Sequence, residues 1–146
     1  MTRRQRVDGN KFQEEFEKAV SKVIGKEAIR RLHTPGAGRS GLTQPADFIV
    51  FNNYATYIET KETTRNSLSI SALEQLDEIK KFIGIQKPFM KYYIVVHFIS
   101  FGTIKVITAS EALELLENKK QLIYNMEIGN DFEGLKDFTQ RGIELI

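Results

Sequence analysis

The chain has 146 residues, of which 41% are hydrophobic and 27% charged, as is typical of a single folded domain. It contains no cysteine, which excludes disulfides, zinc–thiolate sites and thiol nucleophiles. The apolar runs are too short to span a membrane, and the polar, basic residues 1–10 do not resemble a signal peptide. We therefore expect a cytoplasmic protein with no membrane partner.

Charge is unevenly distributed along the chain. Residues 1–41 contain ten Lys or Arg and five Asp or Glu, whereas residues 42–146 contain eleven and fourteen. A basic leading segment on a mildly acidic body indicates an arm that meets a polyanion, although a solvated tail explains the charge equally well. We interpret residues 1–9 as a flexible basic arm and residues 10–146 as a single domain.

The first half of the chain predicts one helix, a loop and a hairpin. Apolar residues recur at helical spacing over residues 10–24, with Asn10 as the expected N-cap and Gly25 just past the C-terminal end. Further expected elements are a short strand or helical turn at 28–32, a Gly/Pro/Ser/Thr-rich loop at 33–44, and strands at 46–51 and 56–61, joined through 52–54.

The second half predicts two more helices and two more strands. The expected elements are a helix at 69–83, a buried strand at 92–99, a strand at 103–108, and a helix at 110–118 capped by Ser110. The remainder is expected to be irregular or short-helical. The order α-β-β-α-β-β-α predicts an α/β fold with a mixed central sheet flanked by helices.

Three charged side chains converge in the expected hairpin. If the chain turns through residues 52–54, Asp47 lies opposite Glu59, and opposed residues project from the same face about 5 Å apart. Lys61 shares this face because side chains alternate along a strand. The sequence thus places two carboxylates and one ammonium on one patch.

Adjacent carboxylates repel each other, and a divalent cation relieves that repulsion. Hard oxygen ligands suit Mg²⁺, which can activate a bound water and hold a phosphate, while Lys61 orients the water or stabilises the phosphate. Asp47, Glu59 and Lys61 are therefore candidate catalytic residues, with the two carboxylates as metal ligands. The alternative is a solvated Glu59–Lys61 pair on an exposed sheet face.

This arrangement resembles the PD-(D/E)xK nuclease superfamily. The match consists of Pro45-Ala46-Asp47 followed, after eleven residues, by Glu59-Thr60-Lys61. In detail the chain is similar to Holliday-junction resolvases of the bacterial recombination-U and archaeal types. The supporting features are Gly9 before Phe12, the loop Pro35–Ser40, Glu74-Gln75 on the next helix, and the segment Ile104–Leu116.

The resemblance implies a restriction-endonuclease-like core and specific residue roles. Thr60 would add a backbone carbonyl ligand, and Gln75 would support Lys61 or the water; without the resemblance, Gln75 would be a helix-surface amide. The family often has a Glu on the first helix where this chain has Gln13, with Glu14 adjacent, so these two are possible outer-shell residues. The candidate DNA-binding residues are Arg3, Arg4, Arg6, Arg39 and Ser40.

The function implied is Mg²⁺-dependent hydrolysis of phosphodiester bonds in branched DNA, with Mn²⁺ able to substitute. By the same resemblance we expect a homodimeric Holliday-junction resolvase of DNA recombination and repair, in the cytoplasm of a prokaryotic or phage-infected cell. The alternatives are another nuclease of the superfamily, of restriction or repair type, a non-catalytic DNA-binding module of the same fold, or a purely structural protein.

Overall fold

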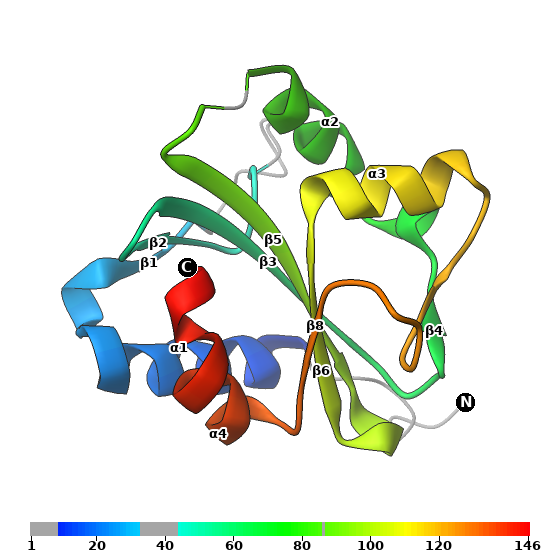
Figure 1. Ribbon diagram of the computed structural model, residues 1–146. Helices are drawn as coiled ribbons and strands as arrows, with labels where there is room; N and C mark the ends of the chain where they lie inside the picture. The colour runs from blue at the N-terminus through cyan, green and yellow to red at the C-terminus, as the bar shows by residue number, and fades with distance from the viewer. Residues whose placement is uncertain (1–8, 33–43, 86) are drawn as a thin grey trace.

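A computed structural model describes residues 9–32, 44–85 and 87–146. The chain forms an α/β fold in which helices cover both faces of a mixed six-stranded sheet (Figure 1). The main helices are α1 (Gly9–Ile24), α2 (Leu76–Ile85), α3 (Ala109–Glu117) and the short α4 (Leu135–Asp137). Within these ranges, no helix combines the length and the apolarity needed to cross a membrane.

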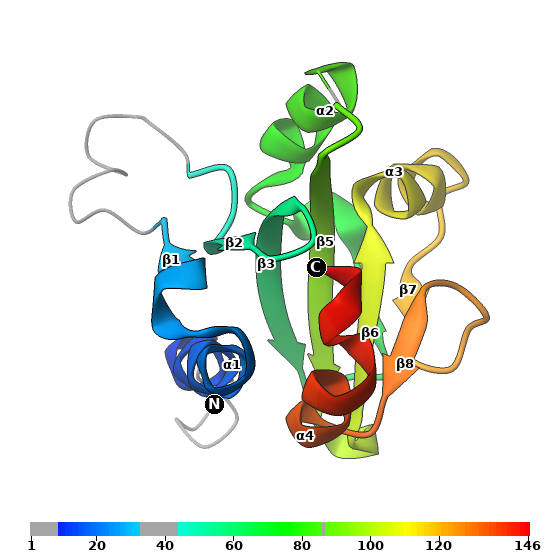
Figure 2. The same cartoon turned by 60° about the vertical axis from the view of Figure 1, so that its left-hand side comes forward.

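The main sheet has the order β1-β2-β3-β5-β6-β8, which can be followed from left to right in Figure 2. Strands β3 and β5 run parallel and all other neighbours are antiparallel. A parallel pair requires a crossover connection, and α2 lies within it. The strands are β1 (Ile29–Arg31), β2 (Phe48–Phe51), β3 (Ala55–Thr63), β5 (Met90–Phe98), β6 (Thr103–Thr108) and β8 (Asn130–Phe132).

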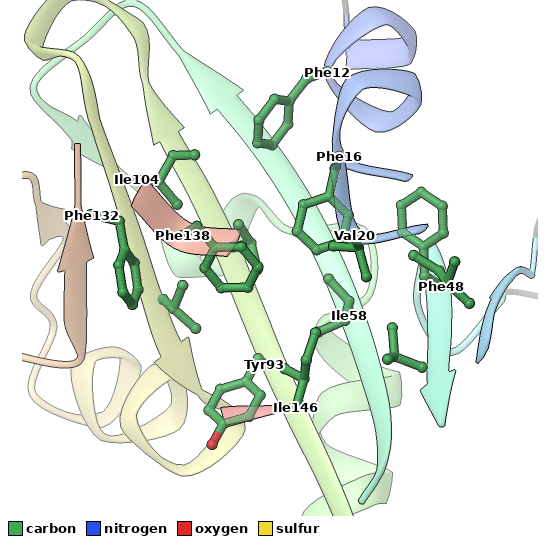
Figure 3. Close-up of a cluster of buried hydrophobic side chains, with 14 residues drawn as sticks. Phe12, Phe16, Val20, Phe48, Ile58, Tyr93, Ile104, Phe132, Phe138 and Ile146 are labelled. Atoms are coloured by element: carbon green, nitrogen blue, oxygen red, sulfur yellow. The ribbon is translucent and has the colours of Figure 1, made fainter. Parts of the chain in front are cut away.

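One face of the sheet packs against α1 and the C-terminal helices. Phe12, Phe16 and Val20 recur at helical spacing on α1 and are fully or almost fully buried. Phe138, from the π-helical turn η5 (Phe138–Gly142), joins them over the sheet (Figure 3). The strand residues of this cluster shown in Figure 3 include Phe48, Ile58, Tyr93, Ile104 and Phe132.

The opposite face packs against α2 and α3. Ile79 and Phe82 from α2, with Ala112 and Leu115 from α3, form a second buried cluster. The strand residues of that cluster include Tyr92, Ile94, Val96, Phe98 and Ile107. Because Ile58 belongs to the first cluster, the alternation along β3 places Glu59 and Lys61 on the α2 face.

The N-terminal half agrees with the expected elements. Gly25 follows α1 with a φ of 94°, and its N–H donates to the Ser21 carbonyl at 2.9 Å, as expected of a residue at this helix end. The segment at 28–32, for which the sequence predicts either a short strand or a helical turn, contains the end of a 3-10 turn η2 (Lys26–Ala28) and then β1. Helix α1 begins at Gly9, so Asn10 lies inside the helix and is not the cap before it, and Gly9 belongs to the helix and not to the arm. The Asn10 side chain, residues 1–8 of the basic arm and residues 33–43 of the loop lie outside the described residues.

The prediction of one continuous helix over residues 69–83 is wrong. A 3-10 turn η3 (Ile70–Ala72) comes first, and α2 begins only at Leu76. Leu73 is extended between them, with φ −71° and ψ 128°. This break lets the buried Ile70 and Leu73 reach the same apolar cluster as α2. Tertiary burial therefore overrides the helical spacing of the segment.

The prediction that Ser110 caps the third helix is also wrong. Thr108, and not Ser110, is the N-cap of α3: its side chain accepts from the Glu111 N–H at 3.0 Å. The Glu111 carboxylate in turn accepts from the Thr108 N–H at 2.9 Å. This reciprocal capping box satisfies two N–H groups that the first turn leaves without partners.

The C-terminal region contains strands where irregular structure was expected. Strand β8 completes the main sheet against β6, and β7 (Leu122–Ile123) pairs with the small strand β4 (Ser67–Leu68). Lys105 on β6 is fully buried, and its ammonium donates to the carbonyls of Met126 at 2.7 Å and Ile128 at 3.1 Å. It also pairs with Asp131 at 2.7 Å. These long-range contacts hold the region against the sheet.

Candidate active site

The hairpin β2–β3 sets Asp47 against Glu59. The strands pair with Phe48 opposite Ile58, the register expected from the sequence, and one further step along it reaches Asp47 and Glu59. The Asp47 N–H donates to the Ile58 carbonyl at 3.0 Å, so Asp47 is bound to β3 although the paired part of β2 begins one residue later. The structure therefore brings the two expected carboxylates to the same end of the hairpin.

The Asp47 carboxylate takes the place of a strand partner for Thr60. Its Oδ2 atom accepts from the Thr60 N–H at 2.9 Å and from the Thr60 hydroxyl at 2.7 Å. The N–H and carbonyl of one strand residue point to the same side, so the Thr60 carbonyl also faces the side on which Asp47 lies. Oδ1 of Asp47 receives no hydrogen bond from the described residues.

Glu59 is a buried acid with an incomplete set of partners. Its residue is 1% exposed, and Oε1 has no hydrogen-bond partner among the described residues. Burial raises the pKa of Glu59 to about 8, with a further increase from the Asp47 charge and an opposing effect of Lys61. A group with this pKa holds its proton at neutral pH until a cation or another positive charge stabilises the carboxylate.

Lys61 joins the carboxylates on the same face of β3. Its ammonium lies 3.5 Å from Oε2 of Glu59. The Lys61 side chain is 29% exposed whereas that of Glu59 is 1% exposed, so Lys61 is the partner of this pair that reaches solvent. An approaching anion would therefore meet the ammonium before it reached the buried acid.

Gln75 lies immediately before α2, in the segment that covers this face of the sheet. Its Oε1 atom is buried and has no hydrogen-bond partner within the described parts of the chain. The structure therefore buries the oxygen of the amide that the resemblance singles out, although the residue is only half-buried. No hydrogen bond between Gln75 and Lys61 is present among these residues.

The donor set fits a magnesium ion. Asp47 Oδ1, Glu59 Oε1 and the Thr60 carbonyl offer the hard oxygen atoms that Mg²⁺ prefers, and Glu59 Oε1 is buried without a hydrogen-bond partner among the described residues. Over the described residues, no three His, Asp or Glu side chains gather as a metal-binding group. Mg²⁺ does not require such a group, because it binds through one or two carboxylates and retains several waters.

The possible outer-shell residues on α1 make no hydrogen bond or ion pair with this cluster in the described part of the chain. Phe12, which precedes Gln13, packs on the opposite face of the sheet and stacks against His97 with ring centroids 5.1 Å apart. Gln13 is half-buried and Glu14 is exposed. Among the described residues, neither one bonds to Asp47, Glu59 or Lys61. The helical register that buries Phe12 decides this placement.

The expected DNA contacts cannot be placed. They fall in the arm and in the glycine-rich loop, outside the described ranges: Arg3, Arg4, Arg6, Arg39 and Ser40.

The sequence does not predict two further polar contacts of these strands. His97 Nδ1 and Glu62 Oε2 lie at hydrogen-bond distance, 2.7 Å apart, across β3 and β5 on the α1 face. The Tyr92 ring is core, as expected, but its hydroxyl donates to the Pro45 carbonyl. Only the register of the parallel pair could have revealed either contact, and that register is not encoded locally.

No model of a known protein family matches this chain, and a search of curated proteins finds no match either.

Proposed function

We propose that this protein is a Mg²⁺-dependent DNA endonuclease with a restriction-endonuclease-like core and that Asp47, Glu59 and Lys61 form its catalytic centre. The observation that carries the proposal is the convergence of two carboxylates and an ammonium where β2 begins beside β3. The unpartnered Oε1 of Glu59 supports it, because a buried carboxyl oxygen without a donor is a costly feature for a purely structural residue.

The two carboxylates and the Thr60 carbonyl would hold the ion. When bound, Mg²⁺ lowers the pKa of a coordinated water and neutralises charge that develops on the phosphate. Mn²⁺ is also expected to bind, since it shares the preference for carboxylate, carbonyl and water oxygens. The Thr60 N–H and hydroxyl hold Oδ2 of Asp47, which leaves Oδ1 for the ion.

The other two side chains act on the water and the phosphate. The Lys61 ammonium is partly exposed beside Glu59, where it can orient the attacking oxygen or stabilise the charge of the transition state. The buried Oε1 of Gln75 can accept a hydrogen bond from that water. Its position at the start of α2, on the same side of the sheet, supports this role.

For the substrate we propose branched DNA, with a four-way junction as the preferred form. A resolvase must cut two opposed strands, so we also propose a homodimer that supplies two centres. Junctions are bound mainly through shape and backbone contacts. The substrate and the dimer rest on the resemblance of the Pro45–Asp47 and Glu59–Lys61 motifs to those of junction resolvases.

A cleavage assay tests the proposal. Labelled four-way junction and linear duplex of matched sequence are incubated with the protein and Mg²⁺, with Asp47→Asn as the control. We expect Mg²⁺-dependent cuts in the junction and none with the variant. Equal cutting of both DNAs would support another nuclease of the superfamily. No cutting with Mg²⁺ or Mn²⁺, together with unchanged thermal stability on metal addition, would refute the metal-dependent site.

A further inference from the structure

Tyr92 connects the interior of the sheet to the segment that carries Asp47. It lies on β5 opposite Tyr57 of β3, and Tyr57 is two residues before Glu59 on that strand. The residue is 3% exposed, and its hydroxyl donates to the Pro45 carbonyl, 47 positions earlier in the chain. Pro45 is two residues before Asp47, so this hydrogen bond fastens the entry to β2.

Two aromatic rings fix the orientation of that hydroxyl. The Tyr92 ring lies 5.5 Å from the Phe82 ring and 5.8 Å from the Tyr57 ring, measured between centroids. Phe82 and Tyr57 also contact each other edge to face at 6.2 Å. A ring held in this way loses little further conformational entropy when its hydroxyl forms a hydrogen bond. Tyr92 can therefore hold a neighbouring segment in place at a small entropic cost.

The segment from Pro45 to Asp47 is anchored at three consecutive points. Pro45 accepts from Tyr92, Ala46 is 1% exposed within the α2-side core, and Asp47 binds Thr60 through Oδ2. We propose that Tyr92 is a positioning residue, whose hydroxyl fixes the Pro45 carbonyl and so aims the Asp47 carboxylate at Thr60 and the metal site. This inference rests on the proposed function, because it assigns Tyr92 to the same centre.

The electrostatic surroundings keep the hydroxyl a donor. Burial raises the pKa of Tyr92 above its ordinary value, and the charges of Glu59 and Asp47 raise it further. Ionisation is therefore suppressed over the whole working range of pH.

The test compares Tyr92→Phe with Tyr93→Phe. The first variant removes the hydroxyl that holds Pro45 and keeps the ring in the aromatic cluster. The second removes the neighbouring hydroxyl on the opposite face of the sheet, where Tyr93 is also buried and belongs to the α1-side cluster. Both changes delete one oxygen atom, so a general loss of stability would appear in both variants.

The primary measurement is amide hydrogen exchange at Thr60, relative to Val95 on the adjacent strand. The Thr60 N–H depends on the Asp47 carboxylate. In Tyr92→Phe we expect this exchange to be faster by about fivefold, as for the loss of one hydrogen bond. In Tyr93→Phe the ratio should remain that of the wild type. Equal ratios in the two variants would overturn the positioning role.

The second measurement is the Mg²⁺ concentration that gives half-maximal cleavage. Loss of a direct outer partner of a metal ligand typically weakens metal affinity about 10-fold or more. Tyr92 holds Asp47 through Pro45, so Tyr92→Phe should raise that concentration by up to about 10-fold and Tyr93→Phe should not. Wild-type Mg²⁺ dependence in an actively cleaving Tyr92→Phe protein would also overturn the role. If the wild type cuts no DNA while Thr60 exchange responds as expected, the positioning role stands and the nuclease proposal falls.

Discussion

Glu59 shows how burial and charge act on one side chain. A solvated glutamate ionises near pH 4.5, whereas Glu59 lies in the interior beside a second carboxylate, and its pKa rises to about 8. Lys61 compensates only in part, because its ammonium is 3.5 Å away and partly in water. The protein therefore carries an acid that is unfavourable when ionised and that a cation would stabilise.

This raised pKa predicts how the stability of the metal-free protein depends on pH. Between pH 4.5 and about 8 the folded state binds more protons at Glu59 than the unfolded state, so stability falls as the pH rises through this window. The slope from this one group is at most about 1.4 kcal/mol per pH unit. Urea denaturation at several pH values should show that Glu59→Gln removes this contribution.

A surface variant provides the control for that experiment. Glu74 is exposed in the segment that leads into α2, so Glu74→Gln should retain the pH dependence of the wild type. A Glu59→Gln protein that loses stability with pH as steeply as Glu74→Gln would show that Glu59 is not the responsible group.

The role of Lys61 can be separated from folding. Lys61→Ala removes the ammonium beside Glu59 and should reduce the cleavage rate by about 100-fold or more, as for other charge-stabilising groups. Junction binding, measured by fluorescence anisotropy in Ca²⁺, should change little, since one amine is a small part of a backbone-contacting interface. A variant with near-normal turnover would exclude Lys61 from the centre.

At the level of the elements, the start of α3 provides a direct test of a capping assignment. Thr108→Ala removes the oxygen that accepts from the Glu111 N–H and should destabilise the protein by about 1 kcal/mol. Ser110→Ala, at the cap expected from sequence, alters an exposed residue inside the helix and should have almost no effect. Urea denaturation of the two variants decides between the caps; equal destabilisation would contradict the observed one.

The elements differ in how far their own residues specify them. Helix α1 follows from the spacing of Phe12, Phe16 and Val20, because one apolar stripe buries against one face of the sheet. The segment at 69–83 has comparable spacing, yet it divides at Leu73 because η3 and α2 each bury apolar residues in the same cluster. Periodicity indicates which residues are buried, but the packing decides where the helix breaks.

At the scale of the whole molecule, the uneven charge predicts how DNA binding responds to salt. Each phosphate contact adds about 0.9 to the slope of log affinity against log salt. If the arm contacts DNA, replacing Arg3, Arg4 and Arg6 together by Gln should reduce that slope by up to about 2.7. Fluorescence anisotropy on a labelled junction over a salt series measures it, and an unchanged slope would show that the arm is only a solvated tail.

The sequence by itself determined the β2–β3 register that brings Asp47 beside the Glu59 strand, and it placed Glu59 and Lys61 on the same face. The reason is that a hairpin is local: a short turn fixes its register, and strand alternation fixes its faces. The same local rules gave α1 and the mixed α/β order of the elements.

Only the tertiary structure decided how these groups are surrounded. Glu59 and the Gln75 Oε1 atom are buried by segments that come from other parts of the chain. The hydrogen bond from Tyr92 to Pro45 and the pairing of β8 with β6 also join residues far apart in the sequence. Such contacts depend on which elements cover which face of the sheet, and the interactions of neighbouring residues do not encode this. The pKa of Glu59 follows from them, because desolvation is a property of the assembled core.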